Sequence, residues 1–297
     1  MPIKLKNAEI QERDVEIFRF ILSSRGCNTT QIYFKFFRPK AAYNTCGIRL
    51  NILFKFGYIM RERESMMSEY VYSLTNKAMG ILRDRGIIKG HRFKPPKLSM
   101  SGKYHDLDVI DLRLVLESDT ELKTSNWISD YELVKGMNAG VGNDKRKANK
   151  RVADGRFILT SGAFQRPFII EYIRHDYSKE RYYSILSKIE YMYSFESVLV
   201  VGSTKEKMDK YYQWFKERKG NRYPGKYVFT FKGSILHSKG LLKADTIKGN
   251  GRTPSFKNLH KPEYNPYSIQ EDLLDGNLNL AKRKLDHDKA NKESENF

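Results

Sequence analysis

The segment spanning residues 152–201 limits the fold more than any other part of the chain. An aspartate in a turn, Asp154, leads into one apolar strand, and a second apolar strand ends on a glutamate, Glu171. A tyrosine-rich helical pattern follows, and after it comes the mostly apolar strand 195–201. Apolar strands combined with an amphipathic helix indicate a sheet that is covered by helices. The segment therefore predicts an α/β core with two carboxylates on neighbouring strands.

The net charge of the chain indicates a polyanionic partner. Its 297 residues include 54 Lys and Arg against 35 Asp and Glu, which gives a formal charge of +19. There is no apolar run of about 20 residues, and the first residues, MPIKLKNAEIQERD, are too charged for a signal peptide. We therefore expect a cytoplasmic protein that binds nucleic acid and no membrane. Cys27 and Cys46 lack the spacing of a metal or redox site, so we expect core thiols.

Residues 1–92 predict a winged helix-turn-helix domain. We expect helices at 12–22, 41–56 and 76–85, and a short helix that is capped by Thr29 or Thr30 and runs to 36. A hairpin should pair 58–63 with 69–74. Helices followed by a two-stranded ribbon and another helix are typical of that fold. Residues 1–100 hold 19 Lys and Arg against 8 Asp and Glu, so the positive surplus is densest there. This surplus favours contact with DNA phosphates.

The third predicted helix and the hairpin would carry the DNA contacts. Polar side chains on this helix and just before it would read the major groove: Arg38, Lys40, Tyr43, Asn44, Thr45, Arg49 and Asn51. Arg61 and Arg63 would touch the backbone from the wing. Basic helical units also mediate protein contacts, which is the alternative for this domain.

Residues 93–101 read as a linker with adjacent prolines, and 102–275 as a second domain. This domain predicts helices at 104–117, 178–193 and 204–218, and strands at 156–160, 168–173, 197–201 and 227–231. A glycine-containing loop at 133–151 carries a basic run with Lys145, Arg146 and Lys147, which could grip a phosphate backbone. The charged end, 276–297, predicts a disordered tail.

Glu171 and Asp154 are the first candidates for chemistry. Because side chains alternate along a strand, Glu171 shares a face with Ile169 and Ile173, where a carboxylate is costly unless it is paired or binds a metal. A short hairpin could bring Asp154 to it, and carboxylates are ligands that Mg²⁺ prefers. Such an ion would activate water or polarise a phosphate. The alternative is a glutamate that simply ends its strand at the solvent edge.

Four motifs in this part of the chain carry a family resemblance. They are an Asp-Gly-x-Phe turn, a strand ending Ile-Ile-Glu, a helix with Leu-x-Lys-Ile-x-Tyr-Met-Tyr, and a Val-Leu-Val-Val strand. Together they resemble the core of PD-(D/E)xK nucleases. With a winged helix in front, the chain is similar to the replication-relaxation proteins, which include MobC-type plasmid relaxases. The resemblance implies a restriction-endonuclease-like mixed sheet flanked by helices, as an α/β (α+β) fold.

The resemblance also implies an activity, a cofactor and partners. The activity would be site-directed nicking of DNA at a transfer or replication origin of a mobile element. The cofactor would be Mg²⁺ or Mn²⁺. The partner would be double-stranded DNA with local strand opening, together with a second copy of the chain or other relaxosome or replication proteins.

The family's site residues transfer to this chain with one departure. Asp154 and Glu171 would be catalytic and would bind the metal, His105 on the first helix would be catalytic, and Asp108 would add a metal ligand one turn later. The motif lysine is missing, because Ile173 stands at its position and Arg174 should face the opposite side. Lys188, on the following helix, is the replacement candidate.

Three alternatives stay open. The chain could be a DNA-binding replication or transcription regulator with an inactive nuclease-like domain, or a restriction endonuclease that cuts both strands. His105 could equally be a histidine satisfied near a helix start. A tyrosine of the helix 178–193 could act as a covalent nucleophile, but helical spacing favours packing for most of these side chains.

Overall fold

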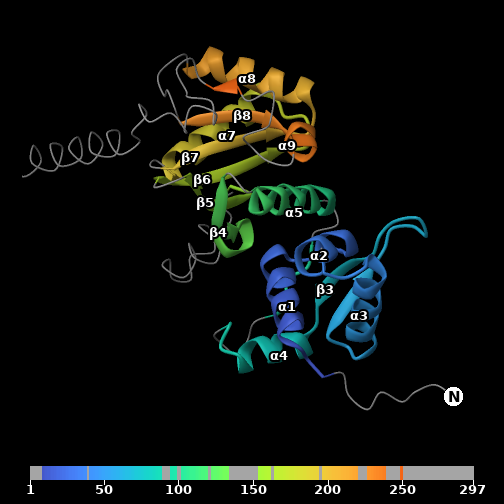
Figure 1. Ribbon diagram of the computed structural model, residues 1–297. Coiled ribbons are helices and arrows are strands. Elements are labelled where there is room, and N and C mark those ends of the chain that lie inside the picture. Colours follow the sequence, from blue (N-terminus) through green and yellow to red (C-terminus); the bar gives the residue numbers. More distant parts are fainter. Residues whose placement is uncertain are drawn as a thin grey trace, which may run out of the picture.

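A computed structural model shows a mixed α and β protein with two sheets (Figure 1). The structure describes residues 9–38, 40–88, 94–98, 102–119, 122–133, 153–161, 164–193, 196–219, 226–238 and 248–249. The basic run with Lys145, Arg146 and Lys147 and the predicted tail lie outside the described residues. Within these ranges, every helix is too short or too polar to traverse a lipid bilayer.

The N-terminal unit surrounds a small antiparallel sheet with the strand order β1-β3-β2. Its elements are α1 (Glu12–Ser24), β1 (Cys27–Asn28), α2 (Thr29–Phe36), α3 (Tyr43–Lys55), β2 (Ile59–Glu62), β3 (Val71–Leu74) and α4 (Asn76–Asp84). All the predicted helices and the hairpin are present. The expected cap of α2 was wrong, because the side chain of Asn28 accepts the hydrogen bond from the Gln31 N–H at 2.8 Å.

The second unit is built on a six-stranded sheet with the order β4-β5-β6-β7-β8-β9. Its elements are α5 (Lys103–Ser118), β4 (Lys123–Ser129), β5 (Gly155–Ser161), β6 (Phe164–Ile173), α7 (Lys179–Met192), β7 (Ser197–Gly202), α8 (Lys205–Lys219), β8 (Tyr227–Phe231), α9 (Lys232–Ser238) and β9 (Lys248–Gly249). Strands β6, β7 and β8 are parallel, and the other neighbours are antiparallel. The sequence did not predict β4, α9 or β9.

Helices cover both faces of this sheet. On one face, α5 and α9 bury the core that includes Leu112, Leu116, Phe157, Ile170, Tyr172, Leu199 and Ile235. On the other face, α7 and α8 bury the core that includes Ile169, Ile173, Tyr182, Leu186, Val200, Tyr211 and Phe215. Successive residues of β6 alternate between these two cores, as the period of two requires.

Helix α5 lies between the two units (Figure 1). It has two buried stripes, one for each unit. Ile110 and Leu114, with the partly buried Leu107, join the core of the N-terminal unit, whereas Val109, Leu112 and Leu116 join the core of the sheet. Each stripe repeats after three and then four residues, so two sides of one helix are apolar. The two units therefore pack against a shared helix.

Polar contacts fasten α5 to the N-terminal unit as well. The side-chain amide of Gln31 on α2 donates to the Leu107 carbonyl at 2.9 Å and to the Asp111 carboxylate at 2.8 Å. The guanidinium of Arg113 donates to the Ser23 hydroxyl at 3.2 Å. Lys35 forms an ion pair with Glu117. Hydrogen bonds and an ion pair, as well as apolar contacts, therefore fix α5 against the N-terminal unit.

Replacement of Leu112 or Leu114 by Ala should destabilise both units together. Each change empties a buried site on a different side of α5, at an expected cost of about 2–5 kcal/mol. The chain contains its own probes, because Trp127 and Trp214 lie in the second unit and Cys27 and Cys46 are buried in the N-terminal unit. In urea, Trp fluorescence and thiol labelling should report one common transition for each variant.

The matched control for this prediction is Ile48→Ala, since this α3 side chain is 63% exposed. It should leave the transition almost unchanged. Separate midpoints for the two probes would contradict the shared-helix interpretation.

Candidate functional site

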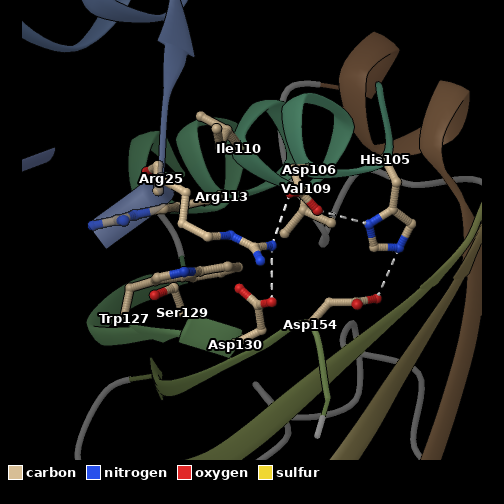
Figure 2. A pocket seen from close by; sticks show the side chains of 11 residues that line it. Arg25, His105, Asp106, Val109, Ile110, Arg113, Trp127, Ser129, Asp130 and Asp154 are labelled. Carbon is tan, nitrogen blue, oxygen red and sulfur yellow. Dashed lines mark hydrogen bonds and ion pairs between the residues drawn. The ribbon is translucent and has the colours of Figure 1, made fainter. Parts of the chain in front are cut away.

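A pocket lies where the end of α1, the first turns of α5 and strand β4 meet (Figure 2). Three carboxylates line it, those of Asp106, Asp130 and Asp154, together with the cationic side chain of Arg25 and the ring of His105. The remaining lining residues are Ser24, Val109, Ile110, Arg113, Trp127 and Ser129. Both units contribute to this pocket, and the sequence had pointed to two of its residues, His105 and Asp154.

Asp154 is held in place through its backbone and its side chain. It stands just before β5, where its N–H donates to the Ile170 carbonyl at 3.0 Å and its carbonyl accepts from the Asp130 N–H at 3.3 Å. Its carboxylate oxygen Oδ2 accepts from the Tyr172 N–H at 2.6 Å and lies 3.4 Å from Nε2 of His105. The carboxylate therefore faces α5.

His105 lies in the first turn of α5, and both of its ring nitrogens face oxygen acceptors. Nδ1 is 3.3 Å from the Asp106 carboxylate, and Nε2 is 3.1 Å from the Tyr172 carbonyl. Burial acts to lower the pKa of His105, but the carboxylates of Asp154 and Asp106 outweigh it and raise the pKa to about 11. The imidazolium has a proton on both nitrogens, which matches these acceptors. The raised pKa of His105 favours the imidazolium form at neutral pH.

Arg25 brings a second cation from the N-terminal unit. It follows the last turn of α1 in a left-handed conformation, with a φ of 62°. Its Nη2 atom lies 2.8 Å from the Asp106 carboxylate and 2.9 Å from that of Asp130. Burial raises the pKa of Asp130 to about 6, although the charge of Arg25 acts in the opposite direction. The three carboxylates are thus cross-linked by two cations, as Figure 2 shows.

Asp108 belongs to a neighbouring polar cluster and not to the pocket. Its carboxylate accepts from the Tyr172 hydroxyl at 2.8 Å and forms ion pairs with Arg174, at 2.5 Å, and with Lys232. Lys232 also lies 3.2 Å from the Asp111 carboxylate. Two cations and a hydroxyl therefore already satisfy Asp108, which was expected to bind metal.

Glu171 lies on the other face of the sheet from the pocket. It is 2% exposed and, as predicted, shares its face with Ile169 and Ile173 beneath α7 and α8. There its charge acts together with burial to raise the pKa values of Tyr182 and Tyr193. The structure therefore does not bring Glu171 to the side of the sheet that the Asp154 carboxylate faces.

Arg174 and the replacement candidate Lys188 lie on opposite sides of the sheet. Arg174 faces the side opposite to Glu171, as expected, and this is the side of α5, where it reaches Asp108. Lys188 is exposed on the outer side of α7, and α7 covers the face that lacks the pocket. On the α5 side, Tyr172 in β6 and Arg174 just after its end are two residues apart. The expected motif requires a carboxylate and a lysine at this spacing, and Tyr172 and Arg174 supply neither.

These placements do not fit a metal centre made by Asp154, Glu171 and Asp108. In the described part of the chain, no three His, Cys, Asp or Glu side chains form a group able to share an ion. The carboxylates that do line one pocket have Arg25 and His105 between them. A divalent ion would have to displace one of these cations.

The start of α3 presents a polar surface. Tyr43, Asn44 and Thr45 are exposed, whereas Cys46 and Leu50 point into the core. Arg38 and Lys40, just before the helix, are exposed as well. Five of the predicted DNA contacts therefore lie together on the surface.

Arg49 is turned into the protein, unlike those residues. Its Nε donates to the Asp14 carboxylate at 2.9 Å, and its Nη2 donates to the Glu9 carbonyl at 2.8 Å. Asp14 is fully buried and also accepts from the Gln11 N–H at the start of α1. Breaking such a buried pair costs about 3–5 kcal/mol. Arg49 thus stabilises the junction of α1 and α3, which corrects its expected place on the DNA surface.

Arg61 and Asn51 connect the hairpin to α3. The guanidinium of Arg61 lies 4.2 Å from the ring centre of Phe54 and 4.6 Å from that of Tyr70. It also donates to the Asn51 side-chain oxygen at 3.3 Å. Arg63 is exposed, 5.1 Å from the Tyr70 ring centre. Of these two arginines, Arg63 is therefore the more exposed.

Comparison with family models, curated proteins and solved structures finds no match to this chain. The functional argument therefore depends on the residues and their geometry.

The pKa of His105 gives a direct test of the pocket. In the folded protein, its ring signal in NMR should stay constant between about pH 5 and pH 9, where an ordinary histidine titrates near pH 6.5. Because this folded pKa is raised above the unfolded one, the stabilisation is complete below about pH 6.5 and is lost as the pH rises towards 11. Asp154→Asn should lower the pKa. A wild-type midpoint near 6.5 would contradict the assigned charge.

Proposed function

We propose that this protein binds duplex DNA through its N-terminal unit, as a replication or transcription regulator. In this proposal α3 enters the major groove and the β2–β3 hairpin touches the backbone. The observation that carries it is the exposed start of α3, where Tyr43, Asn44 and Thr45 stand beside Arg38 and Lys40. The order of elements in this unit is also the one expected of a winged helix-turn-helix.

The charge distribution supports the same partner. The first 100 residues hold 19 Lys and Arg against 8 Asp and Glu, and one of these acids, Asp14, is buried against Arg49. Phosphates of DNA are the partner that such an excess favours. The polar side chains at the start of α3 supply the donors and acceptors that base edges require.

In this proposal the second unit does not cleave DNA. It supports DNA binding and is coupled to the N-terminal unit through α5. Its mixed sheet flanked by helices is the architecture that the family resemblance implies, but its acids are engaged differently. Glu171 is buried beneath α7 and α8, and Asp108 is neutralised by Arg174 and Lys232. These contacts support the regulator over the nuclease. Because α5 is shared, this unit also fixes the orientation of the DNA-binding surface.

Removal of exposed cations should weaken DNA binding and flatten its dependence on salt. Each lost phosphate contact reduces the slope of log K against log salt by about 0.9, so Arg38→Ala with Arg63→Ala should reduce it by about twice that value. Fluorescence anisotropy with a labelled duplex at several salt concentrations measures the slope.

The matched control is Lys188→Ala, which removes an exposed cation from the outer side of α7. Its slope should equal that of the wild type. If all variants share one slope, the hairpin and the start of α3 do not contact phosphates.

Nicking of one strand at a transfer or replication origin is the second candidate function. Its supporting observation is that Asp154 and His105, two residues expected to be catalytic, do line one pocket. This candidate corresponds to the relaxase resemblance and to a requirement for Mg²⁺ or Mn²⁺.

A supercoiled plasmid distinguishes the two candidates. The protein would be incubated with the plasmid and Mg²⁺ or Mn²⁺, alongside Asp154→Asn and the buried control Glu171→Gln. We expect tight binding with the supercoils unchanged for all three proteins. Open circles from the wild type but not from Asp154→Asn would support nicking, and linear product would support a restriction endonuclease.

A further inference from the structure

The turn between β2 and β3 exposes two adjacent methionines. Met66 is 84% exposed and Met67 is 96% exposed. Across the described residues, four of the seven large apolar side chains recorded as exposed lie in α3 or this turn, namely Tyr43, Ile48, Met66 and Met67. Single exposed apolar residues are ordinary, but several of them on one helix and on the hairpin turn beside it are typical of an interaction site.

The turn holds the methionines in a defined position. The Ser65 N–H donates to the Ser68 hydroxyl at 2.9 Å, and the same hydroxyl donates back to the Ser65 carbonyl at 2.9 Å. The Ser68 N–H also donates to the Ser65 carbonyl at 3.2 Å. Met66 and Met67 are therefore the central residues of a hydrogen-bonded four-residue turn. Such a turn presents both side chains at its tip.

The hairpin is also anchored to α3 at its base. Arg61 lies between the rings of Phe54 and Tyr70, as described above. Near the start of β3, the Glu69 carboxylate accepts from the Tyr43 hydroxyl at 2.9 Å and from the Thr30 hydroxyl. The tip therefore has a constant place relative to the helix proposed to enter the major groove.

The charges of the hairpin favour DNA over a membrane as the partner. Arg61 and Arg63 both stack on Tyr70, so they share the side of β2 that faces α3. Glu62 and Glu64 alternate with them and are exposed. A membrane surface would surround the tip and meet these acids. A duplex lying along α3 approaches instead from the side of Arg61 and Arg63, where the nearby acid Glu69 is hydrogen-bonded to Tyr43 and Thr30. In a DNA duplex, the apolar faces of the base pairs lie inside the polyanionic phosphate backbone, so the duplex offers a partner for the apolar tip.

We propose that Met66 and Met67 insert as a wedge between base pairs of the minor groove beside the site of α3, and bend the duplex. This inference rests on the proposed DNA binding and adds the deformation of the DNA. Methionine is one of the apolar side chains that unstack base steps in this way. The preferred step is a flexible pyrimidine–purine step such as TA, because it unstacks most easily.

The test uses the full chain and a duplex of about 30 base pairs with dyes at its ends and a central TA step. Energy transfer between the dyes reports bending, and 2-aminopurine at the step reports unstacking. Anisotropy measures affinity on the same duplex. For the wild type we expect shortened end-to-end distance and increased 2-aminopurine fluorescence on binding.

The double variant Met66→Ala with Met67→Ala should lose most of both signals, while its affinity falls by less than about tenfold, since the phosphate contacts remain. Met66→Leu with Met67→Leu keeps the apolar volume and should retain both signals.

Three results would overturn the inference. Binding of the wild type without bending or unstacking would do so, as would equal bending by the alanine variant. A loss of vesicle binding in the alanine variant, with DNA bending unchanged, would assign the methionines to lipid instead. If neither the wild type nor any variant bound DNA, the proposed function itself would be wrong, and not only this inference.

Discussion

The structure depends on the burial of α5 on two sides. One stripe of this helix completes the core of the N-terminal unit, and the other completes one face of the six-stranded sheet. Among the polar residues of the helix, Asp106, Asp108 and Asp111 lie between these stripes, and His105 continues the stripe that faces the sheet. They meet polar and charged groups from both units, with Arg25, Gln31 and Lys232 among their partners. The polar network is therefore a consequence of the shared helix.

Local patterns in the sequence predicted most of the elements, because those elements bury regular apolar stripes. The strand at β8 was predicted with its exact bounds, Tyr227–Phe231, since its side chains are apolar on both faces. Strand β4 escaped prediction because its sequence, KTSNWIS, is largely polar and its register shifts between Ser125 and Ile128. Helix α9 is only seven residues long, too short to establish a helical period.

Contacts between distant residues were much harder to predict than elements. Alternation correctly assigned Glu171 to the face of Ile169, yet it could not show that the Asp154 carboxylate turns towards α5 from a bend before its strand. Likewise, Arg49 has the spacing of a surface residue on α3, and only the buried Asp14 of α1 explains its orientation. Arg25 and Asp130 gave no local signal at all. Their partners lie on other helices and strands, so these contacts form only when the elements pack together.

The arrangement of β6, β7 and β8 has a consequence for which side of the sheet can receive another unit. Parallel neighbours joined in chain order require crossovers of one hand, and both connecting helices, α7 and α8, consequently lie on the same face. The opposite face is left to α5, which precedes the sheet in the chain, and to the short helix α9, which follows β8. The handedness of two crossovers thus decides where the N-terminal unit can attach, and with it the side of the molecule on which the shared pocket forms.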